Sequence, residues 1–214
     1  MDTYDLNAFT MQCFSLKGKN AVITGANNGV GMGYAYALMK AGANVLIPCL
    51  NDNNWDTLCT VAADCGVQVE FLKGDLCDDA FRTQVVSAAQ ERFGSIDILI
   101  NNAGFIIRKP LLECSDRDWT SVMNVNCDAL YFLSRRVAEV MVRQQHGKII
   151  NICSMISFRG GINNIGYAAS KHAVAGITKN FANELGKYHI QVNGIAPGYI
   201  AAGNSEEIIN DEAI

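Results

Sequence analysis

Short apolar runs alternate with longer amphipathic segments along most of this 214-residue chain, and this alternation constrains its fold most strongly. The apolar runs read as strands at residues 20–24, 44–47, 67–72, 97–100, 148–152 and 190–195. Segments with helical spacing separate them, at residues 31–41, 54–65, 78–93, 115–145 and 167–189. Strands that are apolar on both faces and alternate with helices are typical of a parallel sheet. The sequence therefore predicts an α/β fold with helices covering both faces of the sheet.

Nothing in the sequence marks a boundary between domains. The chain has three prolines and no repeat, low-complexity tract or linker, so we predict one domain over residues 1–214. Pro48 predicts that the second strand stops there, because proline removes a ladder hydrogen bond. Ser115, with Asp118 three residues later, predicts the start of a helix.

Charge and hydropathy argue against several classes of protein. Half of the residues are hydrophobic and 18% are charged, which argues against disorder. The net charge of −4, without a cluster of Lys and Arg, argues against nucleic-acid binding. No stretch reaches the roughly 18 apolar residues of a membrane-spanning helix. The first residues also lack the order of a signal peptide. We therefore expect a cytoplasmic protein with no nucleic-acid or membrane partner.

Eight cysteines raise the question of disulfides or a bound metal. No two of them have CxxC spacing, and the three histidines form no HxxxH pattern, so we expect no metal site. In a chain without an export signal, we expect most of these cysteines to be small buried hydrophobic residues.

A glycine-rich turn, TGANNGVG at residues 24–31, follows the first predicted strand and leads into a helix. Glycines allow a tight turn and leave no Cβ where the backbone meets a pyrophosphate, and the helix N-terminus attracts that anion. A glycine-rich turn alone is weak evidence, but its position after the first strand predicts a dinucleotide site. The residues assigned to it are Gly25, Asn27, Asn28, Gly29, Val30 and Gly31.

The residues after the second strand favour NAD(H) over NADP(H). That neighbourhood reads CLND at 49–52, with no carboxylate at the expected strand end. No Lys or Arg lies between Lys40 and Lys73. A 2′-phosphate would therefore find no cationic partner, and Asp52 and Asp56 would repel it.

Ser154, Tyr167 and Lys171 form a candidate catalytic set. Tyr167 and Lys171 lie at i and i+4, on one face of the predicted helix. A nearby ammonium favours a phenolate, so we expect the pKa of Tyr167 to fall below its usual value of about 10. Tyr167 would then exchange a proton with a substrate oxygen, to which Ser154 donates a hydrogen bond. On its own the set equally fits a solvated helix face and a turn serine.

Further short motifs complete a pattern: Asp75-Leu76, NNAG at 101–104, Asn126, and Pro197-Gly198. In this order and spacing the chain resembles the short-chain dehydrogenase/reductase family over nearly its whole length. The resemblance implies a Rossmann-like doubly wound parallel sheet, an NAD-dependent oxidoreductase acting on CH–OH groups, and a homo-oligomer, by analogy a tetramer. The family continues beyond position 214 with a further helix and strand, so we expect that C-terminal segment to be absent from this chain.

The resemblance also implies roles for individual residues. Asn126 would interrupt a helix and hold a water that relays protons from Lys171, although alone it reads as an ordinary polar helix residue. Catalysis would rest on Asn126, Ser154, Tyr167 and Lys171. Besides the glycine-rich turn, the cofactor would contact Asp75, Leu76, Asn102, Ala103, Gly104, Tyr167, Lys171, Pro197, Gly198 and Ile200.

A closer likeness lies in Arg108 and in the segments 151–161, 181–185 and 196–200. These resemble the family's sugar-acid branch, the 2-deoxy-D-gluconate 3-dehydrogenases and the neighbouring gluconate 5-dehydrogenases. The branch implies a hydroxy or keto sugar acid at Ser154 and Tyr167. Arg108 or Arg159 would pair with its carboxylate, although both also read as solvated charges. A non-catalytic nucleotide-binding module and a scaffold that binds no nucleotide are the alternatives outside this class.

Overall fold

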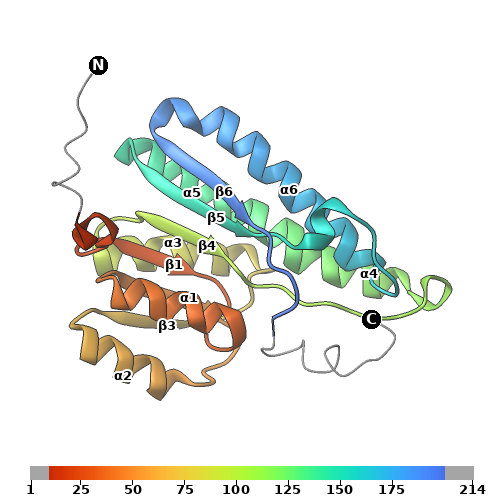
Figure 1. Ribbon diagram of the computed structural model, residues 1–214, viewed down its shortest axis with the longest axis horizontal. Helices are drawn as coiled ribbons and strands as arrows, with labels where there is room; N and C mark the ends of the chain where they lie inside the picture. The colour runs from red at the N-terminus through yellow and green to blue at the C-terminus, as the bar shows by residue number, and fades with distance from the viewer. Residues whose placement is uncertain (1–9, 201–214) are drawn as a thin grey trace.

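Six parallel strands form one sheet in this computed structural model, which describes residues 10–200 (Figure 1). The strands are β1 (Asn20–Ile23), β2 (Asn44–Cys49), β3 (Val69–Lys73), β4 (Ile98–Asn101), β5 (Gly147–Ile152) and β6 (Ile190–Ile195). Their order across the sheet is β3-β2-β1-β4-β5-β6, and each pairs in parallel with its neighbours. This is the doubly wound order, so the predicted fold class is confirmed.

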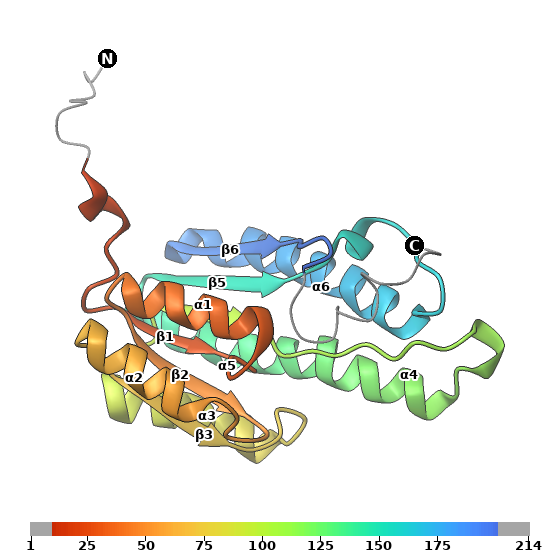
Figure 2. The same cartoon turned by 60° about the horizontal axis from the view of Figure 1, so that its bottom comes forward.

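Helices cover both faces of the sheet (Figure 2). They are α1 (Gly29–Lys40), α2 (Trp55–Cys65), α3 (Asp79–Phe93), α4 (Asp116–Met123), α5 (Leu130–Gln144) and α6 (Ile165–Leu185). Within residues 10–200, no helix is both long and apolar enough to cross a membrane.

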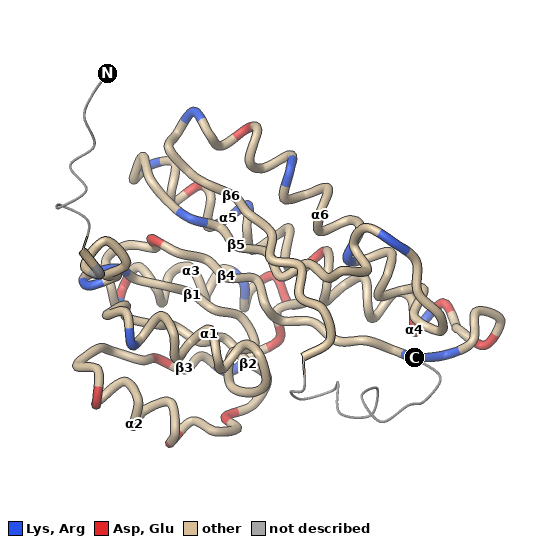
Figure 3. Tube along the Cα trace, viewed as in Figure 1, with Lys and Arg blue, Asp and Glu red and all other residues tan. Residues whose placement is uncertain are grey.

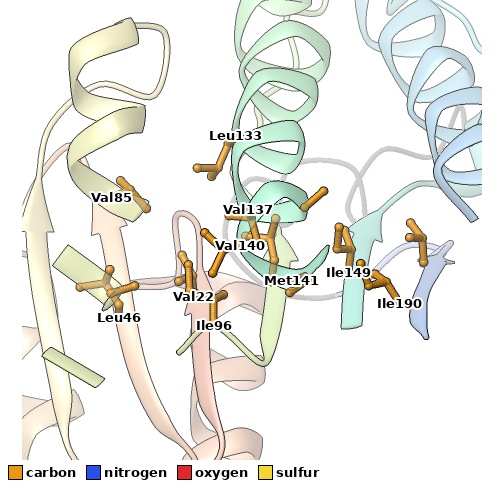
Figure 4. Packing of buried hydrophobic residues seen from close by; sticks show 14 of the residues in the cluster. Val22, Leu46, Val85, Ile96, Leu133, Val137, Val140, Met141, Ile149 and Ile190 are labelled. Carbon is orange, nitrogen blue, oxygen red and sulfur yellow. The ribbon is translucent and has the colours of Figure 1, made fainter. Parts of the chain in front are cut away.

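The buried strand residues divide alternately between two hydrophobic clusters. Val22 and Leu46 belong to the cluster with α3, α5 and α6, whereas Ala21 and Ile47 pack in the cluster with α1 and α2. Figure 4 shows side chains of α5, Met141 among them, packed above the strand residues of the first cluster. Successive strand residues point to opposite faces, so a sheet buried on both sides needs strands that are apolar throughout. That requirement explains why the apolar runs revealed the fold.

The prediction that β2 stops at Pro48 is wrong, because the strand continues to Cys49. Pro48 pairs with Leu72 of β3, and its carbonyl accepts a hydrogen bond from the Gly25 N–H at 3.0 Å. In a strand, the N and C=O of a residue point to the same side. The register places Pro48 opposite Thr24, so the missing N–H would face the carbonyl of Ile23, the last residue of β1, and the proline omits one hydrogen bond at the end of that ladder while the pairing with β3 continues.

The predicted helix over residues 115–145 divides into α4 and α5 at a π-helical segment, Asn124–Ala129. Its start is as predicted: Ser115 and Asp118 form a reciprocal capping box. The interruption has no signal in the apolar periodicity, since the residues on both sides keep helical spacing. It places Asn126 at the junction, where the resemblance implied a break.

Most cysteines are not buried, contrary to the prediction. Only Cys49, Cys127 and Cys153 are buried, and all eight are free thiols. The others lie at partly or fully exposed positions on helices and loops, where a small side chain needs no close packing.

Candidate active site

A cleft of about 780 Å³ lies at the carboxyl ends of the strands, where the strand order reverses between β1 and β4. Ligands of doubly wound sheets bind at this place, and the volume is in the usual range for ligand sites. The sequence-predicted residues that line it are Gly25, Asn27, Asn28, Gly29, Val30, Gly31, Asp75, Leu76, Asn102, Ala103, Gly104, Arg108, Ser154, Tyr167, Lys171, Pro197, Gly198 and Ile200. Asn126 and Arg159 do not line it.

The turn after β1 is held against the turn after β4. The Thr24 hydroxyl accepts hydrogen bonds from the Asn102 and Ala103 N–H groups at 3.0 and 2.9 Å. The Asn102 amide donates to the carbonyls of Thr24 and Gly25, each at 3.0 Å. Gly25 has φ +62°, and a Cβ there would lie 3.1 Å from the Ala103 Cα. Glycine is therefore needed for both the backbone conformation and the close approach.

Helix α1 begins at the cleft without a side-chain cap. Asn28 is its N-cap residue but makes no capping hydrogen bond, and no acidic residue lies in the first turn. A Cβ at Gly31 would collide with the Asn102 amide, so the helix approaches β4 only because this residue is glycine. The uncapped N–H groups and the helix dipole can therefore receive an anion.

Asn27 fixes the other side of the same turn. Its amide donates to the backbone carbonyl and the side-chain oxygen of Asn51, both at 2.8 Å. Asn54, at the start of α2, donates to the Asn27 carbonyl at 2.9 Å. The side chain of Asn27 is thus used to join the glycine-rich turn to the end of β2.

Ser154, Tyr167 and Lys171 come together on the opposite wall of the cleft. Ser154 follows β5, whereas Tyr167 and Lys171 lie one turn apart on α6. Ser154 lies close enough to Tyr167 to lower the pKa of its phenol, and the Lys171 Nζ lies 5.7 Å from the centre of the phenol ring. One cleft therefore joins this set to the glycine-rich turn, as the roles implied by the resemblance require.

The prediction that a neighbouring ammonium lowers the pKa of Tyr167 is wrong for the chain's own groups. Burial raises the pKa of Tyr167, because the phenolate loses hydration. The hydrogen bond from Ser154 and the positive charge of Arg108 oppose this effect without overcoming it. Tyr167 therefore carries its proton near neutral pH.

Lys171 is buried beneath the cleft, with its Nζ donating to the Ile152 carbonyl. Desolvation lowers its pKa to about 8. Near neutral pH the amine is therefore still charged but much closer to losing its proton than an exposed lysine.

Asn126 lies directly behind this wall, only 1% exposed, within the π-helical segment. Its amide donates to the Phe105 carbonyl at 2.9 Å and to the Ser170 hydroxyl at 3.2 Å, and its Oδ1 accepts from the Phe105 N–H at 2.9 Å. The side chain thus anchors the chain after β4 to α6. The proton relay that the resemblance implied for Asn126 stays a prediction.

The two candidate arginines lie in different places. Arg108 lines the cleft, and its charge acts on Tyr167. Arg159 is exposed and donates to the Met155 sulfur at 3.0 Å. Of the two, only Arg108 can reach a group that is bound at Tyr167.

Several cleft residues escaped the sequence analysis. They are Phe105, Ile106, Val125, Met155, Asn164 and Tyr199. Phe105 and Ile106 directly follow the NNAG motif, so a search of the residues flanking each motif would have found them. Asn164 carried no signal, since an asparagine before a helix is most often a cap.

The comparison with known families decides the identity of this fold. The sequence profile described as short chain dehydrogenase matches residues 19–213. The chain belongs to the short-chain dehydrogenase family.

Several relatives in the short-chain dehydrogenase family are similar to this chain over most of its length. The chain is 46% identical over 201 residues to the uncharacterized oxidoreductase YgcW of Escherichia coli (strain K12), covering 94% of this chain and 77% of that one. It is 42% identical over 203 residues to the 2-dehydro-3-deoxy-D-gluconate 5-dehydrogenase of Dickeya dadantii (strain 3937), covering 94% and 79%. A solved structure, described as a putative NAD(P)-dependent gluconate 5-dehydrogenase from Beutenbergia cavernae with bound NADP, is 38% identical with a TM-score of 0.86, covering 94% and 80%.

The cleft fits the nicotinamide dinucleotide that this short-chain dehydrogenase fold binds. An anionic pyrophosphate matches the uncapped start of α1 and the turn in which Gly25 and Gly31 leave no Cβ. At the far end, the buried amine of Lys171 and the phenol of Tyr167 supply hydrogen-bonding groups for a ribose and a substrate oxygen. The chain is thus an oxidoreductase in the coarse sense of its family, and relatives named for sugar acids are among the proteins it resembles.

Proposed function

We propose that this chain reduces a keto sugar acid, and oxidises the matching hydroxy acid, with NAD(H) as the cofactor. The observation that carries the proposal is the single cleft that joins the glycine-rich turn to Ser154, Tyr167 and Lys171. The relatives named as 2-dehydro-3-deoxy-D-gluconate 5-dehydrogenases and gluconate 5-dehydrogenase support a hydroxyl at carbon 5. A solved relative, described as a putative 2-deoxy-D-gluconate 3-dehydrogenase, supports carbon 3 as the second candidate.

Tyr167 is the proton donor in the direction of reduction. Its raised pKa keeps the phenol protonated near pH 7, so it can give a proton to the substrate oxygen as negative charge develops there. Ser154 donates a hydrogen bond to the same oxygen and fixes its place beside the phenol. When bound, the nicotinamide cofactor supplies the hydride for the carbonyl carbon. In the reverse direction, Tyr167 accepts the proton of the alcohol.

Lys171 holds the cofactor in this proposal. Its ammonium would donate hydrogen bonds to ribose hydroxyls of the nicotinamide dinucleotide. Arg108 pairs with the substrate carboxylate, since its planar guanidinium presents two parallel N–H donors. Arg159 is not assigned to the substrate.

The choice of NAD(H) rests on the absence of positive charge around the adenosine end. Of the described residues that line the cleft, only Arg108 and Lys171 are basic, and both lie on the Tyr167 side. Leu50 and Asn51 follow β2 where a 2′-phosphate would lie, and Figure 3 marks only acidic charges on α2. Some solved relatives are described with NADP bound, so both cofactors belong in the test.

The test measures the oxidation of NADH and of NADPH by absorbance, with 2-dehydro-3-deoxy-D-gluconate and 5-ketogluconate as the substrates. We expect turnover of at least one acid, with kcat/KM for NADH above that for NADPH. Binding of NADH without turnover of either acid would instead support the nucleotide-binding module. No change in NADH fluorescence on adding the protein would support the scaffold.

The assembly rests on the resemblance alone, and the location rests on the charge and hydropathy of the sequence. A homo-oligomer, by analogy a tetramer, and a place in the cytoplasm stay predictions. Light scattering of the purified protein checks the first.

A further inference from the structure

A buried arginine on α3 holds the loop that follows β3. The Arg82 side chain is only 6% exposed, and its Nη1 donates to the Leu76 carbonyl at 2.6 Å. Its Nη2 donates to the Asp79 carboxylate at 2.9 Å, and its guanidinium carbon lies 5.1 Å from the centre of the Phe132 ring on α5. Arginine is seldom buried unless it is paired, because its charge loses hydration. The guanidinium is therefore a fixed link between α3, α5 and the loop.

The packing of α3 does not require this charge. The other buried residues of the helix are apolar and belong to the cluster beneath the sheet strands, namely Phe81, Val85 and Ala89. Arg82 is the one charged member of that buried set. A position where a buried charge replaces an apolar side chain is often one where function outweighs ease of folding. The contact with the loop is the candidate for that function.

Arg82 is itself held by a second arginine. Oδ1 of Asp79 accepts from Arg82 and also from Nη2 of Arg136 on α5, at 2.7 Å. Asp79 is thus ion-paired with both guanidinium groups. A planar guanidinium that is fixed at one nitrogen presents its other donors in a set direction. The donor to the Leu76 carbonyl is therefore placed by two helices and not by the loop alone.

Leu76 lines the cleft on the side away from Tyr167. The outer strands β3 and β6 lie at opposite ends of the sheet, with β1 between β2 and β4 (Figure 1). Hydride transfer requires the nicotinamide beside Tyr167, and a pyrophosphate matches the turn after β1. The adenosine of the dinucleotide would then lie after β2 and β3, where Leu50, Asp75 and Leu76 line the cleft. The position of Leu76 thus shapes the wall at the adenosine end.

We propose that Arg82 is a positioning residue for cofactor binding, which acts by holding the Leu76 backbone where its side chain packs against the adenosine. This inference rests on the nucleotide-binding part of the proposed function. Arg82 does not line the cleft, so it acts through the loop. A wall that is already in place binds more tightly, because no free energy is spent on ordering the loop when the ligand arrives.

The experiment measures the dissociation constant for ADP-ribose, the cofactor without its nicotinamide, by isothermal titration calorimetry. Arg82→Met keeps an extended side chain and removes the donor to Leu76, so the affinity should fall about tenfold. Arg82→Lys keeps a charged donor and should stay within about threefold of wild type. Arg92→Met, at a 64% exposed position on the same helix, is the matched control and should bind as wild type does.

A second control separates positioning from stability. Asp97→Ala removes a buried carboxylate at the amino ends of the strands, where it accepts from the Asn20 N–H at 2.9 Å. It should lower the free energy of unfolding and leave the affinity for ADP-ribose unchanged. An equal loss of affinity in Asp97→Ala and Arg82→Met would overturn the inference, and so would unchanged affinity in Arg82→Met or no recovery in Arg82→Lys.

Two further outcomes keep the test decisive. If Arg82→Met does not fold, Asp79→Asn decides instead, since it weakens the hold on Arg82 from a 71% exposed side chain. Its affinity for ADP-ribose should fall about threefold, and an unchanged value would overturn the inference. A wild type that binds ADP-ribose but turns over no sugar acid overturns the proposed reaction alone. A wild type that binds neither NADH nor ADP-ribose overturns both.

Discussion

Polar groups at the amino ends of the strands are paired with one another, whereas several at the carboxyl ends are not. At the amino ends of the strands, Asp97 accepts hydrogen bonds from the Asn20 N–H at 2.9 Å and the Ser95 hydroxyl at 3.1 Å. It also pairs with Lys19 at 3.2 Å and His146 at 3.1 Å. We call Lys19, Asn20, Ser95, Asp97 and His146 the amino-end network. All of these contacts except that between Ser95 and Asp97 join segments that are distant in sequence, so the network ties β1, β4 and β5 together.

At the carboxyl ends, the cleft leaves polar groups without such partners. The start of α1 is uncapped, and Lys171 is charged although buried. Each of these arrangements costs folding free energy, and each suits a ligand that the chain alone does not supply. The fold is thus stabilised by paired groups at the amino ends of the strands and keeps groups for a ligand at the carboxyl ends.

Replacement of Tyr167 by Phe is expected to have the largest effect. It removes the proton donor while keeping the ring, so kcat should fall about 1,000-fold, within the usual range for a general acid. The dissociation constant for NADH and the free energy of unfolding should stay close to wild type. Steady-state kinetics, NADH fluorescence and urea unfolding measure the three quantities. A variant with more than a tenth of wild-type kcat would remove Tyr167 from the chemistry.

Replacement of Asp97 by Ala should lower the stability of the fold and leave the activity almost unchanged. It leaves the buried Asn20 N–H unpaired, breaks the ion pair with Lys19 and removes the hydrogen bond with His146, so we expect a loss of about 2 kcal/mol in the free energy of unfolding. The kcat of the folded protein should change less than twofold. Asp64→Ala, on an exposed position of α2, is the matched control and should change stability by less than about 0.5 kcal/mol.

The pH dependence of this effect follows from the pKa of Asp97. Burial alone would raise it, but hydrogen bonds from Asn20, His146, Lys19 and Ser95 outweigh burial and lower it. The stability that ionised Asp97 contributes is therefore present above its unfolded pKa of about 4 and is lost as the pH falls through the folded value. Urea unfolding below pH 4 should show the gap between wild type and Asp97→Ala closing. A gap that widens in acid would contradict this account.

Replacement of Lys171 by Met should stabilise the fold while abolishing activity. Near pH 7 the amine is charged in both states, and burial penalises the charge only in the folded one. Removing it should add about 1–3 kcal/mol to the free energy of unfolding. The wild type gains the same stability as the pH rises from about 8 to the ordinary lysine value of about 10.4, so the gap should close by pH 10 to 11. Urea unfolding at pH 7 and pH 10 checks the sign; a destabilised variant at pH 7 would contradict it.

The sequence predicted the residues of the cleft better than those of the amino-end network. Tyr167 and Lys171 lie at helical spacing, and Gly25 and Gly31 lie in a turn after a strand, so local patterns carry them. The amino-end network joins residues up to 78 positions apart, as Lys19 and Asp97 are, and no local pattern relates such residues. Its partners become neighbours only through the order of the strands.

The strand bounds were predicted within two residues, because burial on both faces makes each strand apolar throughout. Two features were predicted wrongly because they depend on what surrounds each group in the folded chain. Pro48 is tolerated inside β2 because β1 ends at Ile23, so the proline omits only the last hydrogen bond of that ladder while the pairing with β3 continues. The sign of the Tyr167 pKa shift depends on burial, which the spacing to Lys171 does not reveal.

The smallest predicted effect concerns the part of the cleft after β2, where the adenosine of the cofactor would bind. Leu50 lines the cleft after β2 and is 67% exposed, so Leu50→Arg places a guanidinium there without disturbing the core. One charge-assisted hydrogen bond to a 2′-phosphate should raise the affinity for NADPH about tenfold and leave that for NADH within twofold. Fluorescence titration with both cofactors gives the ratio. Leu112→Arg, the same change at a 97% exposed position outside the cleft lining, separates this effect from a general attraction of anions. If both variants gain the same affinity for NADPH, net charge explains the result. If Leu50→Arg gains no affinity for NADPH, the adenosine ribose lies elsewhere, and the preference for NAD(H) loses its structural basis.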